Sequence, residues 1–175
     1  MDDVYIDKVL LGDVAAFSFF VKTYKNMAFN LAISIVKDEQ YAEEVTQDAF
    51  MKAFTGLKSF KRTATFKSWF YRIVVNESFM QLRKLKKARI LVPLEEVKEV
   101  AMEEELDEDS IQKTYEIQKV LSQLTPKEGL VLQLFYLEEV SLNEITEITG
   151  WTLTNTKVIL HRARKSVRKI CNRNI

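Results

Sequence analysis

The residues of this sequence best suited to chemistry are those that would contact nucleic acid, and they cluster between residues 153 and 169. A helix is expected there, because Thr156, Leu160 and Ala163 recur at helical spacing. The opposite side of that helix is mostly polar or basic, and it would offer hydrogen-bond donors to base edges and cations to phosphates. The residues on this outer side are Thr154, Asn155, Lys157, Val158, His161, Arg162 and Lys165.

A second, shorter helix is expected directly before this one. Ser141 and Glu144 have the spacing of a capping box, and Gly150 ends the helix that the box begins. A short capped helix, a glycine-centred turn and a basic second helix make the pattern of a helix-turn-helix, which places its second helix in the major groove. The alternative is an ordinary pair of helices that packs on its neighbours. The uninterrupted basic face favours DNA binding.

A basic and aromatic unit between residues 60 and 89 suits single-stranded nucleic acid. Phe60 lies in a lysine- and arginine-rich loop, and a run of aromatic and polar residues follows at 69–76. Exposed bases stack on aromatic rings at roughly 1–3 kcal/mol per base, while cations follow the backbone. Trp69 and Phe70 belong to the inward stripe of the predicted helix, so we expect them in the core. Phe60 is less easily explained as a core residue.

A third group of polar side chains lies on the outer face of a helix expected at residues 39–55. Glu44, Gln47 and Asp48 face away from its apolar stripe, which consists of Ala42, Val45, Ala49, Phe50, Ala53 and Phe54. Charge alone is nonspecific, and a solvated helix face explains these residues equally well.

The charges of the chain are strongly segregated although the formal net charge is only +1. Residues 58–89 hold ten lysines and arginines against Glu77 alone, and residues 157–173 hold seven and no acid. Between them, residues 95–109 hold nine acids against Lys98 alone. Two basic blocks around an acidic one indicate two polyanion-binding surfaces joined by a solvated tether.

The composition limits the class of protein. Only 4 glycines and 2 prolines occur in 175 residues, which favours long helices over a turn-rich β-fold. The single histidine and single cysteine cannot make a zinc site by themselves, and one cysteine cannot form an internal disulfide. We expect no cofactor and no small-molecule substrate. Neither a signal peptide nor a membrane span is visible, so a soluble cytoplasmic protein is expected.

These patterns predict an all-α fold with two small helical bundles joined by an acidic linker. Apolar spacing predicts helices at 13–36, capped by Asp13, and at 39–55, then a loop at 57–65 and a helix at 66–91. The first bundle would therefore span residues 1–91 and the linker 92–109. The second bundle would span 110–175, with a capping box at Thr125–Glu128, the helix-turn-helix, and a last helix that runs to about Lys169.

Three stretches, in this order, resemble bacterial RNA polymerase sigma factors of the extracytoplasmic-function subfamily. Residues 41–50 resemble the polymerase-binding helix of that family and residues 66–76 its promoter-melting helix. Residues 144–150 together with 157–164 resemble its C-terminal helix-turn-helix. The resemblance covers nearly the whole chain, and its subfamily follows from the absence of an intermediate domain.

The resemblance implies a role for each group of side chains. Glu44, Gln47 and Asp48 would dock on the coiled-coil clamp of core RNA polymerase. The residues that would hold the non-template strand of the minus-10 element are Phe60, Lys61, Arg72, Ile73 and Asn76. Those that would read the minus-35 duplex are Lys157, Val158, His161 and Arg162, next to Thr154 and Asn155. Many members of the family have a Gly-Thr-Val type run at the start of this helix, so the resemblance does not extend to the base preference of Thr154 and Asn155. An anti-sigma factor is a partner that the family implies.

Two other classes of function are weighed against this one. A stand-alone helix-turn-helix regulator would bind a palindromic operator unaided, usually as a dimer. An enzyme acting on nucleic acid would need clustered carboxylates or a nucleophile beside a base. The acids lie in the linker or along one helix face, and His161 lies among arginines, so an enzyme is the least favoured class.

Overall fold

The computed structural model describes residues 1–91 and 120–173, and this part of the chain is built from helices alone, as predicted. The acidic linker predicted at 92–109 and the predicted start of the second bundle at 110–119 lie outside the described residues. None of the described helices is long and apolar enough to span a lipid bilayer.

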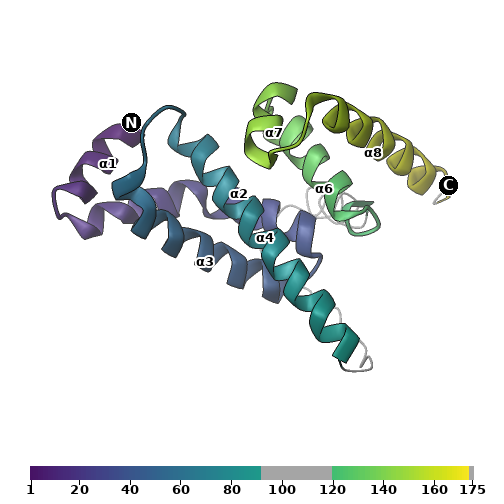
Figure 1. The fold of residues 1–175 in the computed structure, drawn as a ribbon, viewed down its shortest axis with the longest axis horizontal. Helices are drawn as coiled ribbons and strands as arrows, with labels where there is room; N and C mark the ends of the chain where they lie inside the picture. The colour runs from purple at the N-terminus through teal and green to yellow at the C-terminus, as the bar shows by residue number, and fades with distance from the viewer. Residues whose placement is uncertain (92–119, 174–175) are drawn as a thin grey trace, which may run out of the picture.

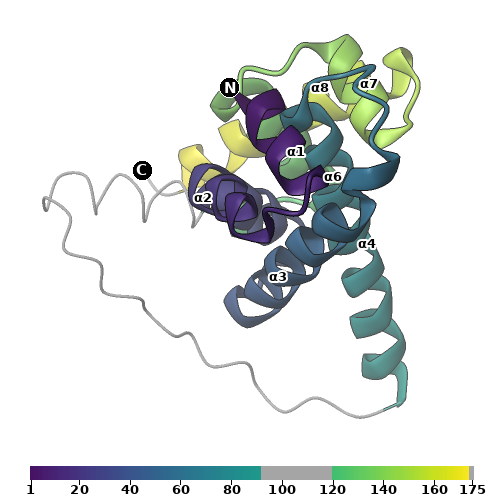
Figure 2. The ribbon, with the colours of Figure 1, turned by 90° about the vertical axis from the view of Figure 1, so that its left-hand side faces the viewer.

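The first bundle is formed by α1 (Asp2–Leu10), α2 (Ser18–Val36), α3 (Glu39–Gly56) and α4 (Phe66–Leu91), shown from purple to teal in Figure 1. Helices α2, α3 and α4 all pack against one another. The apolar stripe predicted for α3 is confirmed, because Ala42, Val45, Ala49, Phe50 and Ala53 are buried and Phe54 is partly buried. The last turns of α4 project beyond the other helices of the bundle (Figures 1 and 2).

The prediction of one helix over residues 13–36 is wrong at its start. Residues Val14–Phe17 form a separate 3-10 turn, η1, and α2 begins only at Ser18. Asp13 caps η1 instead of α2, since its carboxylate accepts a hydrogen bond from the backbone N–H of Ala16 at 3.2 Å. The tighter turn follows Gly12, whose φ of 105° reverses the chain after α1, and it buries Phe17. A second 3-10 turn, η2 (Leu57–Ser59), lies in the predicted loop.

The second bundle contains α6 (Pro126–Leu132), a π-helical turn η3 (Gln133–Leu137), α7 (Leu142–Thr149) and α8 (Leu153–Arg173). Both predicted capping boxes are present. The hydroxyl oxygens of Thr125 and Ser141 accept from the backbone N–H of Glu128 and Glu144, and both glutamates accept from the backbone N–H of their partner. The last helix extends to Arg173, beyond the predicted end near Lys169.

The two bundles share one apolar core, which the sequence analysis does not predict. Residues of α6, η3, α7 and the turn between η3 and α7 join the same buried cluster as the helices of the first bundle; they are Leu130, Leu134, Val140, Ile145 and Ile148. Helix α6 packs against α2, and α7 packs against α4 (Figure 2). A Cβ atom on Gly129 would lie 2.6 Å from the backbone oxygen of Ser34. Glycine at this position therefore permits the close approach of α6 to α2.

Candidate nucleic-acid and polymerase interfaces

The outer face of α8 is exposed in the described structure. Thr154, Asn155, Lys157, Val158, His161 and Arg162 are all exposed, as predicted. The opposite face anchors the helix through Thr156, Ile159, Leu160 and Ala163, which are buried. Leu153 is 38 % exposed, because it is the first residue of the helix and precedes the packed turns. Ile159 is a further core residue, which the predicted inner stripe did not include.

The turn before α8 has the geometry that a helix-turn-helix requires. Gly150 adopts the left-handed conformation, with φ 72° and ψ 12°, and its N–H donates to the carbonyl oxygen of Thr146 at 2.8 Å. Ile145 and Ile148 bury the inner face of α7. Thr152 caps α8, since its hydroxyl accepts from the N–H of Asn155 at 3.2 Å.

Farther along α8, basic side chains gather beside two aromatic residues of η3. The Arg164 guanidinium donates from Nε to the hydroxyl of Tyr136 at 2.8 Å and lies 5.8 Å from the ring centre of Phe135. A shallow groove on the surface of α8 is lined by His161, Arg164, Lys165 and Arg168. This surface extends the basic face of α8 toward its C-terminal half and suits an anionic backbone. The sequence analysis did not single out Tyr136, whose partner lies 28 residues away.

The predicted minus-10 residues lie at the start and along one side of α4. Arg72 and Asn76 are exposed one helical turn apart, and Ile73 between them is partly buried. Lys61 is exposed in the preceding loop. Phe60 is partly buried, because its ring packs on Trp69 with centroids 4.8 Å apart.

Two neighbours of Phe60 differ from what the sequence analysis expects. Phe70 is fully buried, but Trp69, also expected in the core, is only partly buried and supports the Phe60 ring. Arg62 turns back toward α1 and pairs with Asp7, while its guanidinium lies 3.9 Å from a carboxylate oxygen of Asp3. Hydrogen bonding to Asp7 raises the pKa of Arg62. Arg62 is thus engaged within the first bundle rather than presented to a ligand.

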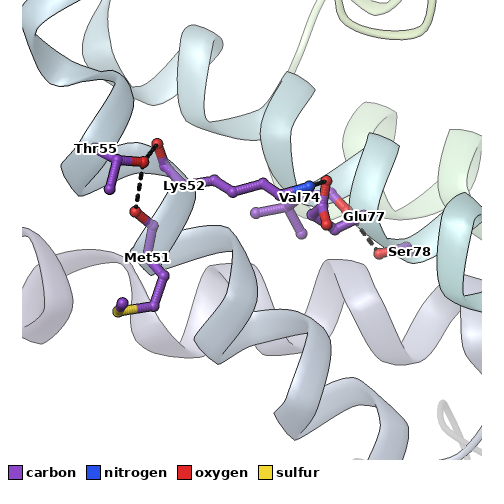
Figure 3. A network of polar contacts seen from close by, with 6 residues as sticks. All are labelled: Met51, Lys52, Thr55, Val74, Glu77 and Ser78. Atoms are coloured by element: carbon purple, nitrogen blue, oxygen red, sulfur yellow. Dashed lines mark hydrogen bonds and ion pairs between the residues drawn. The ribbon is translucent and has the colours of Figure 1, made fainter.

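The outer face of α3 presents the third predicted group. Glu44, Gln47 and Asp48 are exposed, and Met51 among them is 65 % exposed. Asp38 caps the helix by accepting from the N–H of Tyr41 at 3.0 Å. At the edge toward α4, the Lys52 ammonium pairs with the carboxylate of Glu77 (Figure 3), and the nitrogen and oxygen atoms lie 2.6 Å apart. The face is an acidic surface with one large exposed apolar side chain, Met51, next to it.

Polar contacts between the two bundles surround their shared core. The Tyr71 hydroxyl donates to Oε2 of Glu138 at 2.7 Å, and the Lys67 ammonium lies 3.4 Å from the same oxygen. Burial and this hydrogen bond raise the pKa of Tyr71. On the other side, Lys37 donates to the carbonyl oxygen of Leu121 at 2.5 Å. Burial lowers the pKa of Lys37 to about 8, although the charge of Glu128 opposes the shift.

Comparison with known proteins identifies the family of this chain. The model of sigma-70 region 2 matches residues 20–88, and the model of sigma-70 region 4 matches residues 120–169. The chain is 30 % identical over 174 residues to the ECF RNA polymerase sigma factor SigW of Bacillus subtilis, which covers 94 % of this chain and 93 % of SigW. The chain belongs to the extracytoplasmic-function sigma factors.

Other sigma factors agree with this identification. SigV of Bacillus subtilis is 30 % identical over 148 residues, covering 85 % of this chain and 86 % of SigV. Among solved structures, the sigma factor RpoE of Bartonella quintana in complex with the anti-sigma factor NepR has a TM-score of 0.73 at 22 % identity, covering 89 % of this chain and 96 % of that one. CnrH in complex with the cytosolic domain of CnrY has a TM-score of 0.70 at 17 % identity over 98 % and 97 % of the two chains. These likenesses support the fold.

Membership of this family confirms the class of function predicted from the sequence. An extracytoplasmic-function sigma factor binds core RNA polymerase and directs initiation at particular promoters, and it catalyses no reaction of its own. The stand-alone regulator and the enzyme acting on nucleic acid are therefore set aside. Regions 2 and 4 correspond to the two bundles, so α3 and α4 belong to region 2 and the helix-turn-helix belongs to region 4.

Proposed function

We propose that three separate helix faces of this sigma factor divide the work of initiation. The outer face of α3 docks on core polymerase, the exposed side of α4 holds the opened minus-10 strand, and the outer face of α8 reads the minus-35 duplex. The observation that carries this division is that each helix is anchored in a core by its other face. The predicted contact residues remain exposed on all three, apart from the partly buried Phe60 and Ile73.

Polymerase docking is assigned to Glu44, Gln47 and Asp48. Two carboxylates at a spacing of four residues lie on the same side of a helix, and Met51 supplies an apolar surface beside them. The charges of such a face steer the encounter with the polymerase. An apolar side chain that becomes buried on binding slows dissociation of the complex. The residues would meet a basic helical surface on the polymerase.

Strand capture is assigned to Phe60, Lys61, Arg72, Ile73 and Asn76. Turning a base out of the stack costs a few kcal/mol, so the pocket that receives it must already be formed. The support of Phe60 by Trp69 fixes the ring before any strand arrives. Arg72 would pair with a phosphate, and the amide of Asn76 can both donate to and accept from a base edge.

Duplex recognition is assigned to the first turns of α8. Thr154, Asn155, Lys157 and Val158 lie nearest the N-terminus of the helix, where a recognition helix meets base edges. His161 and Arg162 follow one turn later and would contact bases or phosphates according to the depth of the helix in the groove.

The two bundles must separate when both promoter elements are bound. The centres of elements at minus-35 and minus-10 lie about 25 base pairs apart, or about 85 Å along B-form DNA. A compact chain of this length is only about 40 Å across. The arrangement joined by Tyr71 and Glu138 is therefore a closed state that precedes promoter binding.

A partner that favours the closed state would keep the factor inactive. RpoE of Bartonella quintana is solved with an anti-sigma factor, and CnrH with the cytosolic domain of CnrY. By analogy, this chain works in the bacterial cytoplasm and is restrained there by an anti-sigma partner, which could hold it at the membrane. Promoter DNA, core polymerase and that partner are its expected ligands.

The docking assignment is tested by a pull-down of purified core polymerase with the Asp48→Arg variant. Binding should fall below detection, because a positive charge replaces one of the two docking carboxylates, while the circular dichroism spectrum stays unchanged. Glu43→Arg is the matched control, since Glu43 is an exposed acid of the same helix that is not among the assigned docking residues. Equal binding by Asp48→Arg and the wild type would exclude the docking face.

A further inference from the structure

The ion pair between Lys52 and Glu77 joins the docking helix to the strand-capturing helix. Its nitrogen and oxygen atoms lie 2.6 Å apart, and the side chains extend toward each other from α3 and α4 (Figure 3). The side chain of Glu77 is only 8 % exposed, whereas that of Lys52 is 52 % exposed. Lys52 is thus a surface lysine whose ammonium is drawn inward by a buried carboxylate.

Lys52 has another acid within reach on its own helix. Asp48 precedes it by four residues, and an acid four residues before a lysine is the favourable orientation for a pair along a helix. Among the described residues, however, Asp48 takes part in no ion pair. Lys52 pairs with Glu77 instead of Asp48 because leaving a buried carboxylate without a cation costs far more free energy than leaving an exposed one unpaired. The Asp48 carboxylate is consequently left without a neutralising neighbour.

We propose that Glu77 is a positioning residue for polymerase docking, which it serves by holding Lys52 away from Asp48. The role rests on the docking function proposed above for Asp48. With Lys52 paired to Glu77, the face presents the carboxylates of Glu44 and Asp48 without an ion-pair partner among the described residues. Without Glu77, the Lys52 ammonium turns to Asp48 and has to be displaced before the polymerase can bind.

In an alternative interpretation, the ion pair has only a structural role: it acts as a strut that holds α3 against α4. The two readings differ in what the removal of both partners does. Replacing a buried ion pair by apolar side chains of similar size usually preserves the fold. If the pair is only a strut, loss of Glu77 and loss of both residues should weaken binding alike. If Glu77 restrains Lys52, removal of Lys52 as well restores binding.

The test measures the affinity of core polymerase for the full-length chain by competition at low salt. Glu77→Met should weaken binding about two- to threefold, the size expected of an exposed pair along a helix, and the loss should vanish at high salt. The double variant Lys52→Met/Glu77→Met should return to the wild-type affinity. Glu43→Met removes the same charge without releasing Lys52, and it should bind like the wild type.

Carboxyl NMR supplies a readout that a strut would not move. In Glu77→Met the side-chain carboxyl resonance of Asp48 should move because a cation now lies beside it, and in the double variant it should return to its wild-type position. Wild-type affinity of Glu77→Met, or equal weakening in the single and double variants, would overturn the proposal. Asp48→Asn separates the two failures. If it binds like the wild type, the docking assignment fails and the positioning role with it; if it binds weakly while Glu77→Met does not, the positioning role alone fails.

Discussion

The hydroxyl of Tyr71, on α4, and the carboxylate of Glu138, just after η3, meet at 2.7 Å although 67 residues separate them in the chain. Tyr71 is 1 % exposed, and the side chain of Glu138 is 14 % exposed. A hydrogen bond to a charged group in such a setting contributes about 1.5–3 kcal/mol. The contact therefore stabilises the closed arrangement of regions 2 and 4 in which this chain is described.

Removing this contact should favour separation of the bundles. Tyr71→Phe keeps the buried ring and deletes the hydroxyl, and a loss of about 1.5 kcal/mol would raise the separated population about tenfold. A cysteine in place of Ser34, which is buried beside Gly129, reports the separation through its rate of thiol modification once Cys171 is changed to serine. The rate should rise about tenfold. An unchanged rate would mean that the hydroxyl does not hold the bundles together.

The closed state should also depend on pH through Lys37. Its pKa is about 8 when closed and near its ordinary 10.5 when the bundles part, so the closed form binds this proton less strongly. Closure should therefore strengthen as pH rises above about 8, and be weakest below it. The fraction of closed molecules is measured between pH 7 and 9.5 by energy transfer between dyes on Cys171 and on the Lys22→Cys position, in the Tyr71→Phe background.

Lys37→Met is the control for that dependence. It removes the titrating group, so closure should become nearly independent of pH over the same range. The partly buried neighbour Glu128 keeps its hydrogen bonds from Thr125 and Ser166 and should stay ionised, because these bonds and the charge of Arg162 outweigh the effect of burial and lower its pKa. The same rise in closure with pH in Lys37→Met would assign the effect to another group.

Asn76 should govern the choice of minus-10 sequence. Asn76→Ala removes a side chain able to bond to a base edge, which corresponds to about tenfold fewer open complexes on a cognate promoter. A scrambled minus-10 element should be affected far less. Lys84→Ala, an exposed cation farther along α4, should weaken both promoters equally, as a phosphate contact would. Equal losses on both promoters for Asn76→Ala would place the residue among general backbone contacts.

Arg162 should matter only where a minus-35 element is present. Arg162→Ala should reduce transcription from a cognate promoter by about tenfold or more, in line with the 1–3 kcal/mol of a specific contact. On a promoter whose minus-35 element is scrambled, the variant and the wild type should perform alike. Undiminished transcription from the cognate promoter would remove Arg162 from the minus-35 interface.

The features that the sequence predicts well are local ones. The capping boxes at Thr125 and Ser141 depend on residues three positions apart. The apolar stripe of α3 depends on apolar residues that recur about once per helical turn. The exposure of the outer face of α8 follows from the same periodicity. The break between η1 and α2 was missed, because Asp13 caps either kind of helix equally well in a sequence pattern.

Contacts between distant segments could not be predicted. Tyr71 reads as a core residue of α4 and Glu138 as a surface acid, and nothing in their spacing joins them. The pairing of Lys52 with Glu77, and of Arg62 with Asp7, likewise depends on how helices pack rather than on local pattern. Tertiary packing thus decides which charges of the basic block remain free for DNA.

The central claim is tested most directly by run-off transcription with purified core polymerase, this chain and a library of genomic fragments, followed by mapping of the transcript starts. Defined starts should appear only when both proteins are present, each preceded by shared sequence elements near minus-10 and minus-35. Asp48→Arg should abolish all of them. Unaided binding to a palindromic site, with no starts that depend on this chain, would contradict the account.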